Sequence, residues 1–387
     1  MDGRAVLPAG KRKEVLMLVA ENNKSQKRLL FITPFSLCSN HAGVVYTRQL
    51  LAELSKHCEI DLISFRYKNN KKYHPGDNIK VLEEIEIGTM SKLFSIFSLF
   101  WVFPLFSVRF SWRRCKWMQS LINSNVYDFV YFDFSQTFAY SLFLKHPHKI
   151  LMAHDVMAQK YSRMKTYLRP WAMLSERKIL KQGDVFTFSE KDCKLIKDLY
   201  GYPSRSTTFF LSKEVIAATP TGKGDYFVFF GGWSREENYE ALDWFLNNVN
   251  RLIPDVKYKI IGGGLPDNIK KEIALLPNFE YLGFVDNPYP VIAGAKAEIA
   301  PLRKGAGVKV KCIDALGCGT PVIGTDVAFE GIPDEFSELM LKAETAQDYA
   351  DIISGLNWAI DKRKRFKSFF IERYNDKKIL NYINGNK

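Results

Sequence analysis

The stretch AEIAPLRKGAGVKVKCIDALGCGTPVIGT (297–325) predicts one complete strand–helix–strand unit. Its two ends, AEIAPL (297–302) and TPVIGT (320–325), are short apolar runs of strand length. Between them lies a helical pattern that glycines open and close. A strand, a helix and a second strand in this order form the repeating unit of parallel α/β sheets.

The same alternation extends along the chain in both directions. Helical patterns such as 44–57, 236–249 and 345–374 separate the apolar runs. The predicted strands are 27–35, 59–65, 127–134, 149–155 and 184–190 in the first half, and 226–232, 258–264, 279–283, 297–302 and 320–325 in the second. We therefore predict an α/β fold of two doubly wound, Rossmann-like halves, which bind ligands in the cleft between them.

Composition changes along the chain divide it into five segments. The Pro, Gly and Thr residues of 212–224 are typical of a connector. The predicted segments are a polar N-terminal extension (1–27), a first Rossmann-like domain (28–211), the linker (212–224), a second Rossmann-like domain (225–365) and a C-terminal helix that packs back on the first domain (366–387).

The net charge of +13 favours anionic partners, which include nucleic acid, anionic lipid and phosphorylated small molecules. A merely solubilising surface remains the alternative. The six cysteines are scattered without zinc-site spacing, so we expect no structural zinc and reduced thiols in a cytoplasmic protein. The apolar run near the N-terminus is too short for a secretory signal.

The segment KLFSIFSLFWVFPLFSVRFSWRRCKW (92–117) is apolar and aromatic and then turns basic. Pro104 and Arg109 interrupt it, and its uncharged run falls short of the ~20 residues that span a bilayer. Two interpretations stay open. The segment forms a buried helix pair, or it docks peripherally on an anionic membrane, with aromatic side chains beside Arg113 and Arg114.

The glycines at 305 and 307 predict an anion-binding helix start. They flank Ala306, which leaves the backbone amides unshielded where a helix is expected to begin, at about Val308. Lysines would repel the positive end of the helix dipole, so Lys309 fits there best if an anion binds.

Two further residues of this helix extend the predicted site. Lys311 adds a second positive charge, and Asp314 provides a carboxylate that can accept hydrogen bonds from a ribose diol. We predict that the segment holds the diphosphate and ribose of a nucleotide. A solvated basic helix start is the alternative.

Other candidates follow predicted strands. Gly43 precedes a helical pattern, and His154 and Asp155 lie at a strand's carboxyl end, where a capping Asp with an incidental His is the alternative. Gly232 and Gly264 end two strands of the second half and can clear space for a phosphate or sugar. Neither G-x-S-x-G nor H-E-x-x-H occurs, so nothing favours a hydrolase.

Four pieces of sequence together resemble the retaining family-4 glycosyltransferases of the GT-B fold. They are the early loop that ends in Gly43, HD at 154–155 with SERKILKQGDVFTFSEKD (175–192), FFGGWSREENYEALDWF (229–245) and GAGVKVKCIDALGCGTPVIGTDVAFEGI (305–332). The last piece is similar to the variant common among enzymes that build bacterial surface polysaccharides.

The resemblance implies that the first domain binds the acceptor and the second binds the nucleotide sugar. It places His154 beside the donor sugar, Gly43 under the diphosphate, and Phe284 and Val285 near the base. In our own mechanistic interpretation, Asp155 orients His154. The donor-binding residues that we predict are Gly43, Gly232, Trp233, Arg235, Gly264, Phe284, Val285, Arg303, Gly305, Ala306, Gly307, Val308, Lys309, Lys311, Asp314 and Glu330.

The chain also departs from the family pattern. Ala306 and Asp314 stand where two glutamates are common, and Trp233 and Asn238 stand where an arginine and a lysine are usual. The positive charge for the phosphates must then come from other residues. Candidates are Lys309, Lys311, Arg303 and Arg235.

The resemblance implies a retaining hexosyl or deoxyhexosyl transferase that takes a UDP-, GDP- or dTDP-sugar and acts on a glycan or lipid-linked acceptor. No Asp-x-Asp occurs, so we expect no obligatory metal, and no cofactor besides the donor substrate. Two alternatives remain: a nucleotide-sugar 2-epimerase on the same fold, and a noncatalytic binder of anionic lipid or nucleic acid. Basic residues form no aromatic-interleaved stripe, so a nucleic-acid partner is not expected. We expect a cytoplasmic protein, peripheral on the inner face of the membrane.

Overall fold

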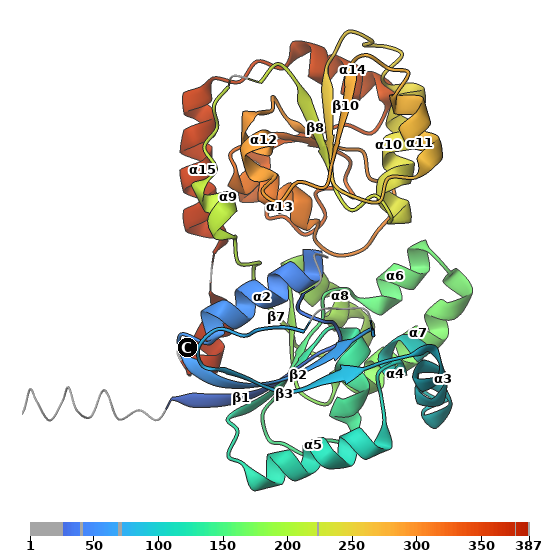
Figure 1. Ribbon diagram of the computed structural model, residues 1–387, viewed down its shortest axis with the longest axis vertical. Coiled ribbons are helices and arrows are strands. Elements are labelled where there is room, and N and C mark those ends of the chain that lie inside the picture. Colours follow the sequence, from blue (N-terminus) through green and yellow to red (C-terminus); the bar gives the residue numbers. More distant parts are fainter. Residues whose placement is uncertain (1–25, 39–41, 69–71, 223, 376, 386–387) are drawn as a thin grey trace, which may run out of the picture.

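The computed structural model describes residues 26–38, 42–68, 72–222, 224–375 and 377–385. Two α/β halves lie one above the other, each with its own parallel sheet (Figure 1). This confirms the predicted fold class. The predicted extension 1–27 lies outside the described residues, except for its last two, of which Lys27 begins the first strand.

The sheet of the first half has seven parallel strands in the order β3-β2-β1-β4-β5-β6-β7. The chain reverses direction across the sheet between β1 and β4, which pair directly. The strands are β1 Lys27–Thr33, β2 Cys58–Arg66, β3 Ile79–Glu86, β4 Phe129–Asp133, β5 Lys149–Met152, β6 Asp184–Thr187 and β7 Arg205–Ser206. The five predicted strands are present, and β3 and β7 at the two edges are additional.

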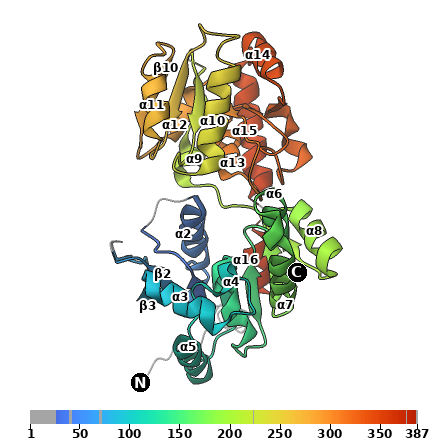
Figure 2. The ribbon, with the colours of Figure 1, turned by 90° about the vertical axis from the view of Figure 1, so that its right-hand side faces the viewer.

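The second sheet has six parallel strands in the order β10-β9-β8-β11-β12-β13. They are β8 Phe227–Phe230, β9 Tyr258–Ile261, β10 Phe279–Gly283, β11 Glu298–Ala300, β12 Val322–Gly324 and β13 Met340–Lys342. Helices cover both faces of the sheets (Figure 2). Burial on both faces explains why runs such as FVYF in β4 and FVFF in β8 are continuously apolar instead of alternating.

Helices of the first half follow its strands. Three of them, α2, α6 and α8, lie at the end of this half that faces the second half (Figure 1). The helices are α2 Ala42–Leu54, α3 Thr89–Ser98, α4 Pro104–Ser107, α5 Trp112–Ser124, α6 Met157–Arg163, α7 Arg169–Leu180 and α8 Glu190–Tyr200, with 3-10 turns η1 Ser135–Leu142 and η2 Thr166–Leu168.

Helices of the second half include α13, the helix predicted by the glycine-rich stretch. It begins at Val310, two residues later than expected, because Lys309 still has an extended backbone and precedes the first turn. The helices are α9 Lys213–Ala217, α10 Glu236–Asn248, α11 Asp267–Ile273, α12 Tyr289–Gly294, α13 Val310–Gly317, α14 Ala346–Gly355, α15 Ile360–Tyr374 and α16 Lys378–Asn384, with the 3-10 turn η3 Asp334–Leu339.

Two segments connect the halves. The predicted linker 212–224 contains the short helix α9, whose N-terminus is capped by the hydroxyl of Ser212. At the other end of the chain, α16 lies against the first half (Figure 2). The hydroxyl of Tyr382 donates to Asp184 Oδ2 over 2.5 Å, and its ring packs on Phe129 and Phe186.

The apolar segment 92–117 divides into a buried and an exposed part. Phe103, Phe106 and Phe110 are buried in the core of the first half, which agrees with the buried interpretation for this part. Phe94 and Phe97 on α3 are instead 67% and 73% exposed. In the described part of the chain, no helix has both the length and the apolar character needed to cross a membrane.

Candidate active site

The carboxyl ends of β4 and β5 bring Asp133 and His154 together. Asp133 is the last residue of β4 and is fully buried, and its Oδ1 lies 2.9 Å from His154 Nε2. Two hydroxyls satisfy its other oxygen, Oδ2: Thr33 donates over 3.0 Å and Thr47 over 2.7 Å. This arrangement fixes the orientation of the imidazole and keeps the proton on Nε2.

Aromatic rings enclose the same imidazole. The His154 ring stacks on Phe134 with the ring centroids 3.4 Å apart, and Phe188 meets it edge-on at 4.9 Å. The Phe134 backbone is in the left-handed region, at φ 59°, directly after β4. A Cβ on Gly43 would lie 2.7 Å from the Phe134 ring, so this glycine leaves room for the ring that supports His154.

Asp155, which we predicted to orient His154, pairs with a lysine in the structure. Its carboxylate lies 3.3 Å from Lys160 Nζ on α6. Asp133 performs the orienting role, because it lies on the neighbouring strand and its side chain reaches the ring of His154. In the sequence Asp133 is only a polar residue at the end of an apolar strand, and it was not among the predicted site residues.

The glycine loop 304–309 of the second half has the backbone that its sequence predicts. Gly305 and Gly307 have φ values of 125° and 69°, which side-chain-bearing residues rarely adopt. Lys309 precedes the first turn of α13, and among the described residues no side chain caps this helix start. Its first amide groups therefore lack a side-chain partner at the point where an anion would bind.

The two halves touch at this loop. A Cβ on Gly307 would lie 2.7 Å from Asp155 Oδ1 and 2.9 Å from the His154 carbonyl oxygen. A Cβ on Gly331 would lie 2.9 Å from the Ser189 side chain of the first half. The predicted residues His154 and Asp155 therefore lie in contact with the predicted glycine loop.

Lys309 and Lys311 point to different partners. Lys309 Nζ donates to the Gly307 carbonyl over 2.6 Å, and burial lowers the pKa of this ammonium. Lys311 Nζ donates to Asn238 Oδ1 over 3.3 Å, and Asn238 in turn donates to the Gly232 carbonyl. Lys311 thus links α13, through Asn238, with the glycine that follows β8.

Two acidic residues belong to α13 and to the neighbouring strand β11. Burial raises the pKa of Asp314 to about 7, and the Tyr289 hydroxyl, 3.4 Å from Oδ2, opposes the shift. Glu298 on β11 was not predicted. It is fully buried, both of its oxygens lack a hydrogen-bond partner in the described part of the chain, and burial raises its pKa to about 8.

Glu330 lies on the loop after β12, and groups of the first half surround it. Arg163 and Gln159 of α6 and Lys191 of α8 all donate to its carboxylate. Burial alone would raise the pKa of Glu330, but the hydrogen bonds from Arg163 and Lys191 lower it to about 2. Glu330 was predicted from the sequence, but none of the three residues that hold it was.

Four further predicted residues lie away from the Glu330 carboxylate. Gly232 follows β8, and the Trp233 indole is buried in the core, where it donates to the Ile261 carbonyl. Arg235 pairs with Glu237, and Arg303 stacks on Trp244, so neither joins the cation group around Glu330.

The last five predicted residues lie in loops of the second half. Gly264 has a φ of 82°, and a Cβ there would press on Ser234 at 3.1 Å. Phe284 is 60% exposed and lies next to Gly263, and Val285 beside it is half-buried. Ala306 and Val308, in the glycine loop, are half-buried.

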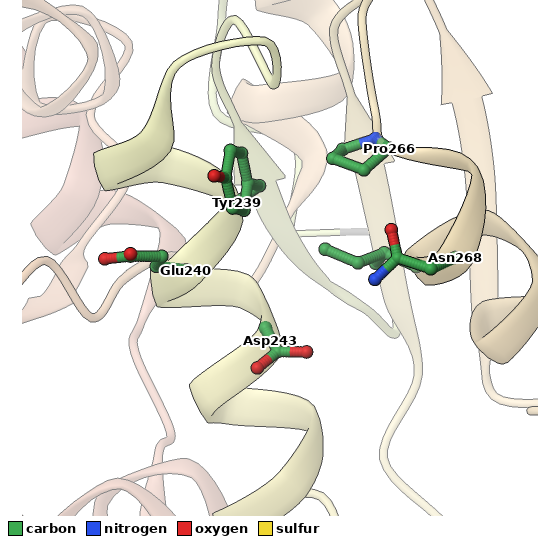
Figure 3. Close-up of a pocket in the computed structure, with 6 residues that line it drawn as sticks. Tyr239, Glu240, Asp243, Pro266 and Asn268 are labelled. Carbon is green, nitrogen blue, oxygen red and sulfur yellow. The ribbon is translucent and has the colours of Figure 1, made fainter.

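A hollow of about 440 Å³ lies between α10 and α11 of the second half (Figure 3). None of our predicted site residues lines it. Its lining residues are Tyr239, Glu240, Asp243, Pro266, Asn268 and Ile269. Among the described residues, no group of three or more His, Cys, Asp or Glu side chains is arranged to hold a metal ion.

Part of the second half is similar to a known protein family. Residues 224–357 match the family model described as "Glycosyl transferases group 1". A curated relative, "Uncharacterized 44.6 kDa protein in cps region" of Klebsiella pneumoniae, is 27% identical over 172 residues. The aligned region covers 40% of this chain and 44% of that relative, so it spans less than half of either protein.

Solved structures match over most of the chain. Anabaena Alr3699/HepE in complex with UDP-glucose has a TM-score of 0.64 at 12% identity, covering 92% of this chain and 98% of that one. WaaG, a glycosyltransferase involved in lipopolysaccharide biosynthesis, has a TM-score of 0.62 at 10% identity, with coverage of 92% and 98%. The chain therefore has the GT-B fold, and its second half is similar to the group 1 glycosyl transferases.

Proposed function

We propose that the chain transfers a sugar from a nucleotide diphosphate donor to a hydroxyl of a saccharide or lipid-linked acceptor, with retention of configuration, in the synthesis of a surface polysaccharide. One observation carries the proposal. His154 and Asp155 of the first half contact the glycine loop of the second half at Gly307, and Asp133 orients the His154 imidazole. Two findings support it: the family match over 224–357, and the UDP-glucose complex of Alr3699/HepE, which has the same fold.

The chemistry begins with departure of the nucleotide diphosphate. The bond from the anomeric carbon to the phosphate oxygen breaks, and negative charge grows on the leaving group beside the glycine loop. The free amides at the start of α13 and the Lys309 ammonium stabilise this charge. His154, oriented by Asp133, hydrogen-bonds the donor sugar and holds it for attack.

The acceptor hydroxyl then attacks from the face that the leaving group has vacated. A new carbon–oxygen bond forms on this face, and the acceptor proton passes to the departing phosphate oxygen. This route preserves the anomeric configuration and needs no strong protein base. We expect no requirement for a divalent metal, because the loop amides and lysines supply the positive charge.

A donor panel tests the proposal. The full chain is incubated with UDP-, GDP- and dTDP-sugars, and nucleotide release and products are read by mass spectrometry. Release of nucleotide from one donor class, together with transfer or slow hydrolysis of the sugar, is the expected result. Release of a free 2-epimer would select the epimerase instead, and release of no nucleotide from any donor would refute the transferase.

Replacing Lys309 with alanine is expected to weaken donor binding by about 10- to 100-fold. The substitution removes a buried ammonium that lies at the glycine loop and would bond a phosphate. Calorimetry with the active donor measures the loss. Lys296→Ala is the matched control, because Lys296 pairs with the exposed Asp225 and lies outside the predicted site. Equal affinities of the Lys309 variant and the unmodified chain would contradict this site.

Donor affinity is expected to rise with pH between 6 and 8. Burial raises the pKa of Asp314 to about 7, so its carboxyl is mostly protonated at pH 6 and mostly ionised at pH 8. A ribose diol donates to the ionised form, so ribose binding favours ionised Asp314 and strengthens as the pH rises. We expect Kd to fall roughly 5- to 10-fold over this range. Asp314→Asn should remove the dependence, and an equally steep profile in that variant would exclude this role.

We also propose that the first half docks peripherally on an anionic membrane. Phe94, Phe97 and Phe100, in and after α3, are 67%, 73% and 75% exposed. Trp101 extends the apolar surface to α7, where its carbonyl accepts a hydrogen bond from the Trp171 indole over 3.5 Å. Such an exposed aromatic surface is costly in water and suits a lipid headgroup layer.

Positive charge borders this surface. Lys178 Nζ lies 5.3 Å from the Trp101 ring centroid, and Lys92 Nζ lies 4.6 Å from the Tyr67 ring centroid. Ammonium groups beside aromatic rings match a layer of anionic headgroups.

Flotation with vesicles containing phosphatidylglycerol tests the docking. The unmodified chain should float with the vesicles, less so at high salt, and the triple variant Phe94→Ser, Phe97→Ser, Trp101→Ser should remain in the soluble fraction. Leu275→Ser is the control, since Leu275 is 83% exposed on the second half. Equal flotation of the triple variant and the unmodified chain would refute the docking.

A further inference from the structure

Four donors from the first half converge on the Glu330 carboxylate of the second half. Arg163 grips it with both ends of its guanidinium: Nη1 lies 2.7 Å from Oε2, and Nη2 lies 2.8 Å from Oε1. Gln159 Nε2 adds a third bond to Oε1 over 3.0 Å, and Lys191 Nζ adds a fourth. This paired arrangement is the way in which arginine recognises carboxylates and phosphates alike.

The cations around Glu330 exceed its single negative charge. Arg163 and Lys191 contact it directly, and Lys309 Nζ of the glycine loop lies 3.9 Å from Oε2. The other nearby carboxylates compensate only in part. Asp192 lies 3.8 Å from Lys191, and Asp155 pairs with Lys160. The cluster can therefore accommodate an anion of higher charge than a single carboxylate.

The cluster also adjoins the glycine loop. Arg163 Nη1 donates to the Gly305 carbonyl over 2.9 Å, so the guanidinium already lies where the loop begins. Two lysines near this loop pair with carboxylates other than Glu330: Lys304 with Glu236 and Glu240, and Lys160 of the first half with Asp155. Arg163 meets the loop from the first half, and Lys191 shares the Glu330 carboxylate with it.

We propose that Arg163 and Lys191 bind the donor's diphosphate, and that Glu330 occupies their donor groups until the donor arrives. This inference rests on the proposed function and extends its phosphate site to the first half. A diphosphate presents oxygen pairs that match the guanidinium as the carboxylate does, with more negative charge. Binding is an exchange of anions, in which Glu330 swings aside.

If the anions exchange, removing the cations and removing the Glu330 carboxylate should change phosphate affinity in opposite directions. In calorimetry on the full chain with inorganic pyrophosphate and with UDP, Arg163→Gln and Lys191→Gln should each weaken binding by about tenfold or more. Glu330→Gln should strengthen binding of the same two probes by about tenfold, because the competing carboxylate is gone. Uridine, which has no phosphate, should bind all variants alike.

Matched controls separate this effect from damage to the fold. Lys194→Gln removes an exposed lysine from the same helix as Lys191, where it pairs with Asp198, and should change neither affinity. Arg163→Lys keeps the charge but loses the paired geometry, and should fall between the unmodified chain and Arg163→Gln. Thermal unfolding midpoints near that of the unmodified chain should accompany every affinity change.

Two results would overturn the exchange. Weaker pyrophosphate binding in Glu330→Gln would make Glu330 a structural tie between the halves, and unchanged binding in Arg163→Gln would remove the arginine from the phosphate site. If the chain transfers sugar but Arg163→Gln binds pyrophosphate as tightly as the unmodified chain, this inference fails and the proposed function stands. If Arg163→Gln weakens pyrophosphate binding but no donor sugar releases its nucleotide, the proposed function fails and the anion site stands.

Discussion

Replacing Asp133 with asparagine is expected to lower the turnover of sugar transfer by about 10- to 100-fold while leaving the affinity for free nucleotide unchanged. Asparagine retains an oxygen that can accept from His154 Nε2, but it removes the charge that holds the imidazole and its tautomer. The donor sugar would then meet a less well-positioned ring. Steady-state kinetics with the active donor, together with nucleotide calorimetry, measures the two quantities separately.

The split between turnover and nucleotide affinity identifies Asp133 as a positioning residue. Thr33 and Thr47 also donate to its carboxylate, so a purely structural role would appear as a lower unfolding midpoint with unchanged turnover per folded molecule. Asp61→Asn is the matched control. Asp61 is another buried aspartate of the same sheet, on β2, where it binds Arg28 and Tyr127 instead of a cleft residue. Its variant should lose stability but keep turnover, and an equal loss of turnover would contradict the special role of Asp133.

Most of the fold could be predicted from local sequence, because strands buried on both faces are continuously apolar. The runs that became β1, β4 and β8 have this character. The strands that escaped prediction lie at sheet edges. β3, with sequence IKVLEEIE, is half-exposed, β7 has only two residues, and β13 of the second sheet has only three. An edge strand buries less surface, so its sequence carries a weaker apolar signal.

The site was only partly predictable, for a different reason. Gly305, Gly307 and His154 stand out because they follow strands or carry unusual backbone or side-chain chemistry. Arg163 and Lys191 look like ordinary surface residues of helices in the sequence. They can be recognised as site residues only in the folded chain, where both side chains reach across to Glu330 in the other half. Contacts between distant segments leave no local pattern.

Glu298 was also missed from the sequence, although the residues around it belong to its own half. It lies on β11 in an otherwise apolar strand, and no contact with solvent or a hydrogen-bond partner supports its charge in the described part of the chain. Burial raises its pKa from 4.5 to about 8, although Lys311 opposes the shift. The folded chain therefore binds a proton that the unfolded chain has already released at neutral pH.

Glu298→Gln is expected to stabilise the protein increasingly as the pH rises. Between pH 4.5 and 8 the folded state holds more protons than the unfolded state, so Glu298 lowers the free energy of unfolding by about 1.4 kcal/mol per pH unit. Glutamine resembles the protonated acid, so the variant and the unmodified chain should have similar unfolding midpoints at pH 5. At pH 8 the variant should be more stable by several kcal/mol. Thermal unfolding measured from pH 5 to 9 gives both values.

The slope of this difference with pH, and not its value at one pH, decides whether Glu298 is buried as a proton-binding group. Glu280→Gln is the control, because Glu280 is an exposed glutamate of the same sheet that pairs with Lys259 at 3.3 Å. Its difference from the unmodified chain should stay small at every pH, as for an ordinary surface pair. Lys311 and Asp314 of α13 both act on the pKa of Glu298. A stability gain that grows with pH would therefore also show that a titrating carboxyl group lies next to α13. A constant difference from pH 5 to 9 would mean that Glu298 ionises as freely in the folded chain as in the unfolded one, and that water or a cation reaches it.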